Sequence, residues 1–325
     1  MPCKKSGHYF FKKTRQAEEA MITQLNAINS TSLRLVLKIK DYLQLSKFTL
    51  SFTVVFSCVI CYLLAPYVVA FDLKMILLLF VAGMLVTGSA NAINQASEKE
   101  TDALMKRTSG RPVASGRMST QEAYSFALIA GLTGVWMMWQ FFNFESAFIS
   151  AISLFIYGFI YTPLKKISAI SVLVGAFPGA FPCLIGWVAG FYPDQHISWT
   201  GGLVLFAIQF LWQFPHFWAI AWVAHGDYQK AGFKLLPNDK GPTRITAFQS
   251  IVYAMMMVPV GMLPFFYGMS GLISFWIVLF CNLFIVMQCV RLYLSMDVKA
   301  AKRVMFSSYI YLPVVLLSLL ADKIH

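Results

Sequence analysis

Three oxygen-bearing side chains recur at helical spacing in the first long polar segment of the chain. Asn94, Glu98 and Asp102 occupy positions i, i+4 and i+8, so a continuous helix would place them along one stripe. Magnesium ions bind a few carboxylate oxygens together with water and substrate phosphate oxygens. Arg107 and Arg111 follow closely, and their guanidinium groups suit phosphate oxygens. This segment therefore predicts a site for magnesium and a diphosphate.

A later polar segment bears on whether these residues form a site at all. Charged residues at a helix end often only pair with one another in water, and the first segment alone allows that interpretation equally well. The segment 216–237 brings a further acid, Asp227, to the equivalent place after a later apolar run. We therefore predict that Asn94, Glu98, Asp102 and Asp227 hold the metal and act in catalysis.

Two adjacent lysines, Lys165 and Lys166, follow a turn that contains Pro163. Ammonium groups presented there would bind an anion, so we predict that both contact the diphosphate together with Arg107 and Arg111. The alternative is that these lysines only fix the orientation of the neighbouring helices, because basic residues in short loops resist transfer across a membrane.

A polar stripe runs through an otherwise apolar segment. Gln209, Trp212, Gln213 and His216 stand at i, i+3, i+4 and i+7. Polar groups are costly in lipid, so this stripe should face the interior of a helical bundle. His216 has two interpretations at this stage: it contacts a bound group, or it is a packing residue whose ring is satisfied by a hydrogen bond.

Composition shows what kind of structure must carry these residues. Of the 325 residues 58% are hydrophobic and only 12% are charged, whereas soluble domains carry about 25% charged residues. The chain is therefore expected to be an integral membrane protein. The formal net charge of +12 does not indicate nucleic-acid binding, because no hydrophilic segment is long enough for such a module. The six cysteines are scattered, and the Cys58–Cys61 pair is expected to be buried and apolar in character.

Nine apolar segments are long enough to cross a bilayer as helices. They cover residues 46–66, 73–93, 121–142, 145–163, 169–191, 199–223, 248–268, 272–292 and 304–321. All of the 26 Lys and Arg residues except Lys74 and Lys323 then fall on the side of the N-terminus. Because basic residues stay in the cytoplasm, the N-terminus is predicted to be cytoplasmic and the C-terminus outside.

The predicted organisation is therefore an all-α bundle of nine transmembrane helices over residues 41–325, with a polar cytoplasmic extension over residues 1–40. The polar N-terminus has no secretory signal and is not a convincing transit peptide, which favours a bacterial inner membrane.

These motifs resemble those of the UbiA-type intramembrane prenyltransferases, over about residues 41–320. Asn94-xxx-Glu98-xxx-Asp102 resembles the first acidic pattern of that family, with Glu in place of its middle Asp, and Arg107-Thr and Arg111-Pro also match. The branch of the family that farnesylates haem is marked by three further motifs, which are Tyr161-Thr-Pro-Leu-Lys-Lys166, Trp212-Gln-Phe-Pro-His-Phe217 and Asp227-Tyr-xx-Ala-Gly232.

Two positions depart from the pattern of the family. Ala231 stands where the second acidic pattern would place a further acid, so a second metal ion is poorly specified. Lys47 is followed by Phe48 instead of the usual proline, which should alter only the entry into the first helix.

The resemblance implies a nine-helix fold and transfer of a farnesyl group from farnesyl diphosphate to a vinyl carbon of haem b, with Mg²⁺ as cofactor and water completing the new substituent. It implies that Trp212, Gln213 and His216 contact the haem. It also implies a lipid bilayer as the surrounding medium and a haem-A-synthase or an oxidase-assembly protein as partner.

Two other functions fit the same residues. Prenylation of a quinone precursor or a chlorophyll-like ring would use the same diphosphate machinery, although the segment Trp212–Phe217 argues against it. A secondary transporter is a candidate of a different class, because a bundle of nine helices with polar mouths would serve transport as well.

Overall fold

The computed structural model describes residues 33–192, 195–238 and 241–324, and no strand occurs in these ranges apart from an isolated bridge between Ser270 and Lys323. The all-α prediction is therefore confirmed for the described part of the chain. Leu45–His325 forms one compact unit, whereas the helical residues 33–44 belong to a separate one. Residues 1–32 lie outside the described ranges, so the extension over residues 1–40 stays a prediction.

The helices of the compact unit follow one another with short connections. In chain order they are α2 (Phe48–Leu64), α3 (Leu73–Ser97), α4 (Lys99–Leu104), α5 (Thr120–Phe141), α6 (Phe144–Phe155), the π-helix η1 (Ile156–Tyr161), α7 (Thr162–Leu164), α8 (Ser171–Ala189), α9 (Trp199–Val223), α10 (His225–Lys230), α11 (Arg244–Phe266), α12 (Leu272–Ser295) and α13 (Val298–Ala321).

Each of the nine predicted segments overlaps one of these helices or the continuous run α6–η1–α7 in the described part of the chain. Seven described helices are long and apolar enough to cross a membrane, and counting Leu33–Leu45 together with α2 as one span gives eight. The helix α5 is not among them, although it packs along α3. The chain is thus an integral membrane protein, and the predicted nine spans exceed by one the number that length and composition support.

Side-chain caps begin several of the long helices. The side chain of Asp72 accepts hydrogen bonds from the first turn of α3, and those of Ser119, Asn143 and Asp297 do the same for α5, α6 and α13. Each cap satisfies backbone N–H groups that have no partner within the helix. These short polar residues therefore define where the helices begin.

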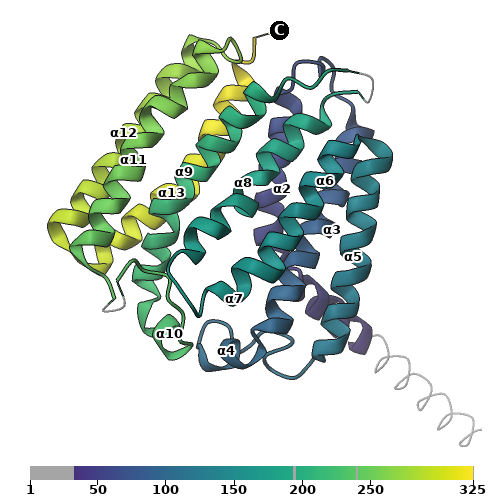
Figure 1. The fold of residues 1–325 in the computed structure, drawn as a ribbon, viewed down its shortest axis with the longest axis vertical. Coiled ribbons are helices and arrows are strands. Elements are labelled where there is room, and N and C mark those ends of the chain that lie inside the picture. The colour runs from purple at the N-terminus through teal and green to yellow at the C-terminus, as the bar shows by residue number, and fades with distance from the viewer. Residues whose placement is uncertain (1–32, 193–194, 239–240, 325) are drawn as a thin grey trace, which may run out of the picture. The chain divides into compact units, whose positions relative to one another are not determined.

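The compact unit is a bundle in which α11 and α12 lie at one edge and α3, α5 and α6 at the other (Figure 1). The helix α8 packs against both α2 and α9 in the middle. A Cβ atom at Gly186 would collide with the main-chain oxygen of Cys58, so α8 approaches α2 more closely than a larger residue would allow. Cys58 and Cys61 are buried and carry free thiols, as predicted.

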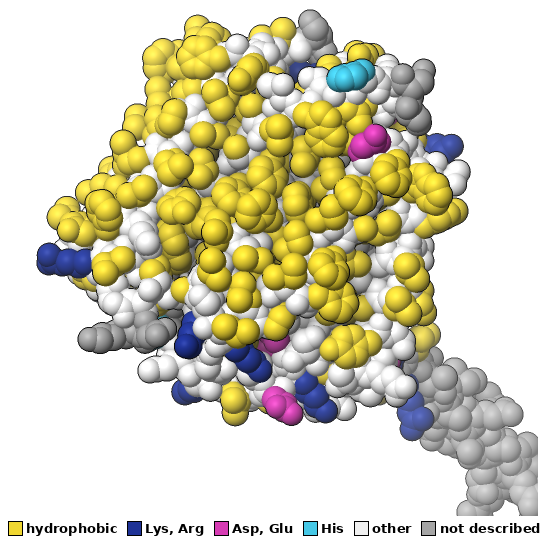
Figure 2. Space-filling model, viewed as in Figure 1, with side chains coloured by type: hydrophobic (Ala, Val, Ile, Leu, Met, Phe, Trp, Pro, Cys, Tyr) yellow, Lys and Arg dark blue, Asp and Glu magenta, His cyan; other side chains and the backbone are white. Residues whose placement is uncertain are grey.

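Apolar side chains cover the face of the bundle seen in Figure 2, and several Lys and Arg side chains gather at the end where α4 and α10 lie. Large apolar residues such as Phe280 and Leu294 are more than 70% exposed. Such an exterior suits the hydrocarbon core of a bilayer, because apolar side chains are stable there. Charged side chains are not solvated in that core, which explains why they gather at one end.

Two local irregularities shape the end of the bundle that carries the charged residues. The helix is not continuous from Asn94 to Asp102, because Glu98 ends α3 and precedes α4. The backbone hydrogen bonds from Glu98 N to Asn94 O (3.0 Å) and from Asp102 N to Glu98 O (2.7 Å) nevertheless keep the helical register across this break. The second irregularity is the π-helix η1, which continues α6 up to Tyr161; such wide turns are frequent at functional sites.

Candidate active site

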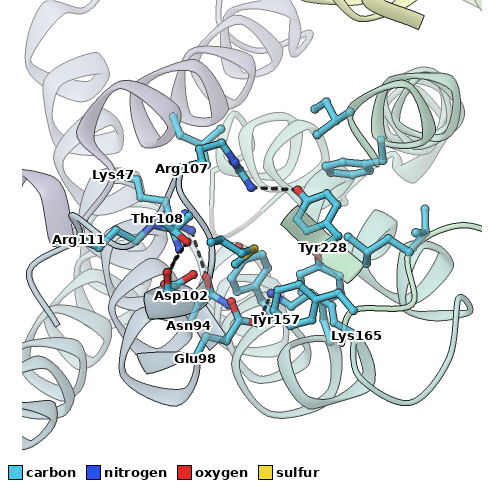
Figure 3. Close-up of a pocket in the computed structure, with 18 of the residues that line it drawn as sticks. Lys47, Asn94, Glu98, Asp102, Arg107, Thr108, Arg111, Tyr157, Lys165 and Tyr228 are labelled. Atoms are coloured by element: carbon cyan, nitrogen blue, oxygen red, sulfur yellow. Dashed lines mark hydrogen bonds and ion pairs between the residues drawn. The ribbon is translucent and has the colours of Figure 1, made fainter. Parts of the chain in front are cut away.

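A cavity of about 330 Å³ opens among α3, α4, η1, α9 and α10. Its size is in the range of small-molecule sites. The polar residues that line it come from segments far apart in the sequence and converge in Figure 3. They are Lys47, Asn94, Glu98, Asp102, Arg107, Thr108, Arg111, Tyr157, Tyr161, Lys165, His216, Tyr228 and Tyr309.

Asp102 lines this cavity with one carboxylate oxygen paired and the other free. Arg111 donates a hydrogen bond of 2.7 Å to Oδ2. Oδ1 is buried and has no hydrogen-bond partner among the described residues. Thr108 donates to the main-chain oxygen of Asp102 at 2.8 Å, which holds the turn between α4 and Arg111. A buried, unpartnered carboxylate oxygen is costly, so this position suits a bound cation.

Glu98 and Lys165 form a buried ion pair across the cavity, with each residue less than 10% exposed. The Lys165 ammonium also lies over the rings of Tyr161 (4.9 Å) and Phe233 (5.3 Å). Burial lowers the pKa of Lys165, whereas the charge of Glu98 acts in the opposite direction. This ammonium is therefore held by one carboxylate and two ring faces rather than by water.

A third basic residue, Lys47, reaches the cavity from the start of α2. Its ammonium donates a hydrogen bond of 3.1 Å to Asn94 Oδ1. Asn94 in turn donates from Nδ2 to Thr162 Oγ1 at 3.4 Å, which fixes the orientation of the amide. The amide oxygen of Asn94 therefore points toward Lys47 in the cavity, as Figure 3 shows.

Arg107 and Tyr228 join the two polar segments across the cavity. Arg107 donates a hydrogen bond of 3.0 Å to the Tyr228 hydroxyl and also lies over its ring at 5.6 Å. Burial raises the pKa of Tyr228 and outweighs the opposing effect of Arg107 and Arg111. Tyr228 is therefore a neutral hydroxyl that anchors an arginine in the lining of the cavity.

Positive charge exceeds negative charge in this cavity. Four basic side chains line it, whereas Glu98 and Asp102 are its two carboxylates. An enclosed site with surplus ammonium and guanidinium groups attracts anions, and its low dielectric strengthens that attraction. The arrangement is therefore suited to binding a multiply charged anion such as a diphosphate.

The structure brings together most of the predicted diphosphate and metal residues but not all of them. Asn94, Glu98, Asp102, Arg107, Arg111 and Lys165 line the cavity. Asp227 lies on α10 and is not among the lining residues, and Lys166 is exposed. Within the described ranges no group of three or more His, Cys, Asp and Glu side chains could hold a metal ion by itself. Three of the four predicted metal residues therefore line one cavity and Asp227 does not, and their binding of a metal stays a prediction.

Two of the three predicted haem residues bond to backbone atoms of neighbouring helices. Gln213 donates from Nε2 to the main-chain oxygen of Ala176 at 2.9 Å. Trp212 donates from Nε1 to the main-chain oxygen of Ser308 at 2.9 Å. Neither residue lines the cavity, whereas His216 does.

Sequence reasoning missed several residues that line the cavity. Lys47 was noted only for the missing proline after it, although it contacts Asn94. Tyr161 and Tyr228 stood inside recognised motifs without a role, and Tyr157 lies one turn before Tyr161, with the two rings 5.2 Å apart. The sequence marked these residues only by their position beside a motif. Such a position does not show which side chains they contact, because the contacts depend on how the helices pack.

Comparisons with known proteins agree with this site and this fold. Residues 54–310 match the UbiA prenyltransferase family. A relative from Cytophaga hutchinsonii, called protoheme IX farnesyltransferase, is 45% identical over 284 residues, which cover 87% of this chain and 98% of the relative. One from Flavobacterium psychrophilum with the same name is 39% identical, with 87% and 94% covered.

Solved structures show the same fold. A structure of a digeranylgeranylglyceryl phosphate synthase has a TM-score of 0.72 at 21% identity and covers 88% of this chain and 98% of its own. A UbiA homolog from Archaeoglobus fulgidus, bound to GPP and Mg²⁺, has a TM-score of 0.60 at 14% identity, with 86% and 99% covered. Given these matches over most of its length, the chain belongs to the UbiA prenyltransferase family.

Proposed function

We propose that this protein transfers the farnesyl group of farnesyl diphosphate to a vinyl group of haem b and so makes haem O. The carbon–oxygen bond of the diphosphate ester breaks, a carbon–carbon bond to the vinyl group forms, and water supplies the hydroxyl of the product. The names and identities of the two bacterial relatives support this substrate pair. Membership in a family of prenyltransferases favours this reaction over the transporter considered from the sequence.

One observation carries the proposal: a cavity with an excess of basic side chains also contains a buried carboxylate with a free oxygen. Lys165 and Arg111 are each paired with a carboxylate. A diphosphate that enters can accept hydrogen bonds from these two groups and from Arg107, since phosphate oxygens suit ammonium and guanidinium donors. The leaving group would then be stabilised as its negative charge develops.

The oxygen donors that line the cavity fit Mg²⁺, and Asp102 has an oxygen without a hydrogen-bond partner to offer. Asp102 Oδ1 is the free buried oxygen, and Glu98 and the amide oxygen of Asn94 are oxygen donors in the same cavity. When bound there, Mg²⁺ would neutralise charge on the diphosphate. The Mg²⁺ and GPP bound by the Archaeoglobus fulgidus homolog support the same use of this fold. Asp227 could reach this metal only through water or a movement of α10, because it does not line the cavity.

The aromatic lining suits the allylic cation that forms when the diphosphate leaves. Tyr157, Tyr161 and Phe233 present rings to the cavity. Ring faces stabilise a cation by about 0.5–2 kcal/mol each while excluding water that would capture it. The protein would therefore delay the addition of water until the carbon–carbon bond has formed.

The reaction itself is the decisive test. Purified protein in detergent is incubated with haem b, farnesyl diphosphate and Mg²⁺, and porphyrin products are identified by mass spectrometry. We expect a product heavier than haem b by one farnesyl group and one hydroxyl group, because the second hydrogen of the water leaves as a proton, and no product when Mg²⁺ is replaced by a chelator. Prenylation of a phenolic quinone precursor but not of haem b would overturn the proposed acceptor.

We further propose that the cavity opens to the cytoplasm of a bacterium, with the N-terminus inside and the C-terminus outside. The partition of basic residues supports this orientation. Gly110 lies in the exposed segment after α4, so Gly110→Cys provides a reporter. Labelling of intact cells by a membrane-impermeant thiol reagent should leave this cysteine unmodified, and its modification from outside would reverse the orientation. Haem O would then supply haem–copper oxidases, and an oxidase-assembly partner stays a prediction.

A further inference from the structure

His216 lies on the wall of the cavity with its ring almost fully enclosed. Only 7% of the residue is exposed, and its neighbours on this wall include Phe217, Ile220 and Tyr309. This part of the cavity is apolar, in contrast to the part that carries Asp102 and the basic groups. A large apolar acceptor would therefore meet His216 while the diphosphate lies among the charges.

Hydrogen bonds determine which ring nitrogen of His216 carries the proton. Nδ1 lies 2.8 Å from Ser308 Oγ. The Ser308 hydroxyl donates its hydrogen to the main-chain oxygen of Met305 at 2.6 Å. With its one hydrogen directed to Met305, Ser308 Oγ is left to accept from His216, and in this arrangement Nδ1 carries the N–H. Nε2 then has a lone pair, and no described residue forms a hydrogen bond with it.

Neighbouring aromatic residues also fix the orientation of the His216 ring. Trp212 stacks on His216 with centroids 4.6 Å apart and 18° between the rings. The Trp212 indole donates to the main-chain oxygen of Ser308, so the same serine holds both Trp212 and His216. Tyr309 meets the imidazole edge-on at 5.2 Å. The ring therefore cannot turn without breaking a stack and a hydrogen bond.

We propose that His216 Nε2 ligates the iron of the porphyrin acceptor and that Ser308 and Trp212 are positioning residues for this ligand. The inference rests on the proposed function, since it assumes that the acceptor is a haem. A porphyrin carboxylate would need an N–H donor, which this tautomer does not present at Nε2, whereas iron needs the lone pair. Histidine ligands of metals characteristically donate their second N–H to a fixed acceptor, as His216 does to Ser308.

The first test separates binding through iron from binding through carboxylates. Full-length protein in detergent is titrated with ferric haem b and, separately, with metal-free protoporphyrin IX. We expect His216→Ala to weaken ferric haem binding at least about 10-fold and to remove the histidine signature from its absorption and electron paramagnetic resonance spectra. Binding of the metal-free porphyrin should be unchanged. Equal loss for both porphyrins would place the ring at a carboxylate or in packing and overturn the inference.

A rescue experiment guards against misfolding of the variant. His216→Gly leaves space for free imidazole, which can bind the iron in place of the lost side chain. Added imidazole should restore the histidine-like spectrum in this variant at concentrations that leave the wild-type spectrum unchanged. Failure of imidazole to restore the spectrum in a variant that still binds metal-free protoporphyrin IX would contradict iron ligation.

The positioning role of Ser308 has a matched control on the same helix. Ser318 on α13 makes the same kind of hydrogen bond, to the main-chain oxygen of Val315 at 2.8 Å, whereas Ser308 also bonds to His216. Ser308→Ala should weaken ferric haem binding by about 10- to 100-fold and leave metal-free protoporphyrin unaffected, as losses of such supporting groups do. Ser318→Ala should change neither. Equal ferric haem affinity in both variants would remove Ser308 from the ligand.

These outcomes separate the inference from the proposed function. A wild-type protein that farnesylates haem b but shows no histidine ligation would overturn the inference alone. A wild-type protein that neither binds nor farnesylates any haem would overturn both.

Discussion

Two regions of this bundle carry polar side chains that are used differently. The region that we call the mouth consists of charged and amide side chains that pair with one another across the cavity, namely Lys47, Asn94, Glu98, Asp102, Arg111 and Lys165. The region that we call the seam lies between α9 and the helices α8 and α13, and its donors bond to backbone carbonyls, namely Gln209, Trp212 and Gln213.

The difference shows which polar groups are available to a substrate. In the mouth, a phosphate oxygen can replace the carboxylate partner of Lys165 or Arg111 without unfolding any helix. In the seam, loss of the donor from Gln213 would leave the main-chain oxygen of Ala176 without that partner, which is costly where no water enters. Polar residues in a membrane bundle are therefore not equally available for function. Those paired with other side chains can exchange their partner for a substrate, whereas those bonded to backbone carbonyls hold the helices together.

The largest effect is expected for Asp102→Asn in the mouth. This change keeps the size of the side chain but removes the charge next to the free oxygen, so turnover should fall at least about 100-fold. The measurement is the rate of farnesylated porphyrin formation at saturating substrates. Unchanged size-exclusion elution and thermal unfolding in detergent would show that the variant is folded. Normal turnover in this variant would remove Asp102 from the chemistry.

Lys165 and Lys166 provide a matched pair for the second prediction. Lys165→Met removes a buried ammonium from the cavity, whereas Lys166→Met removes an exposed one. A hydrogen bond to a charged group contributes about 1.5–3 kcal/mol, so the KM for farnesyl diphosphate should rise roughly 10- to 100-fold in the first variant. The second should stay within about twofold of the wild type, because an exposed charge contributes little. Equal effects would contradict the assignment of the diphosphate contact to Lys165 and not to Lys166.

A smaller effect is expected for Tyr228→Phe, whose side chain lines the same cavity as the mouth. Arg107 would lose the hydroxyl at 3.0 Å but keep the ring, so the KM for farnesyl diphosphate should rise about 3- to 10-fold. Tyr124→Phe is the control, because its hydroxyl is 3.0 Å from Ser97 Oγ and outside the cavity. A change of the same size in the control would show that the effect is not specific to Arg107.

The smallest effect on activity is expected in the seam. Gln213→Leu should lower thermal stability by an amount that corresponds to about 1–3 kcal/mol, because it leaves a buried main-chain oxygen without that donor. The spectrum of bound ferric haem should not change. An altered haem spectrum at unchanged stability would contradict the comparison and restore the contact with haem that the sequence predicted for Gln213.

The sequence alone predicted those features that depend on local composition. A continuous run of apolar residues defines a membrane helix whatever its neighbours are, and all nine predicted segments proved to be helical within the described ranges. The spacing of Asn94, Glu98 and Asp102 likewise placed all three in one cavity. Spacing could not show that Glu98 breaks the helix, since a backbone turn at one residue leaves no mark on the i, i+4 pattern.

Tertiary structure decided the partner of each polar side chain, because a residue's partner depends on which helix packs against it. Gln213 and His216 are neighbours on the same stripe of α9, yet one meets a backbone oxygen of α8 and the other meets Ser308 of α13 and the cavity. Lys165 and Lys166 are adjacent in the sequence, yet the turn after α7 buries only the first. The sequence determined which groups could do chemistry, and the packing of the helices determined which of them remain free to do it.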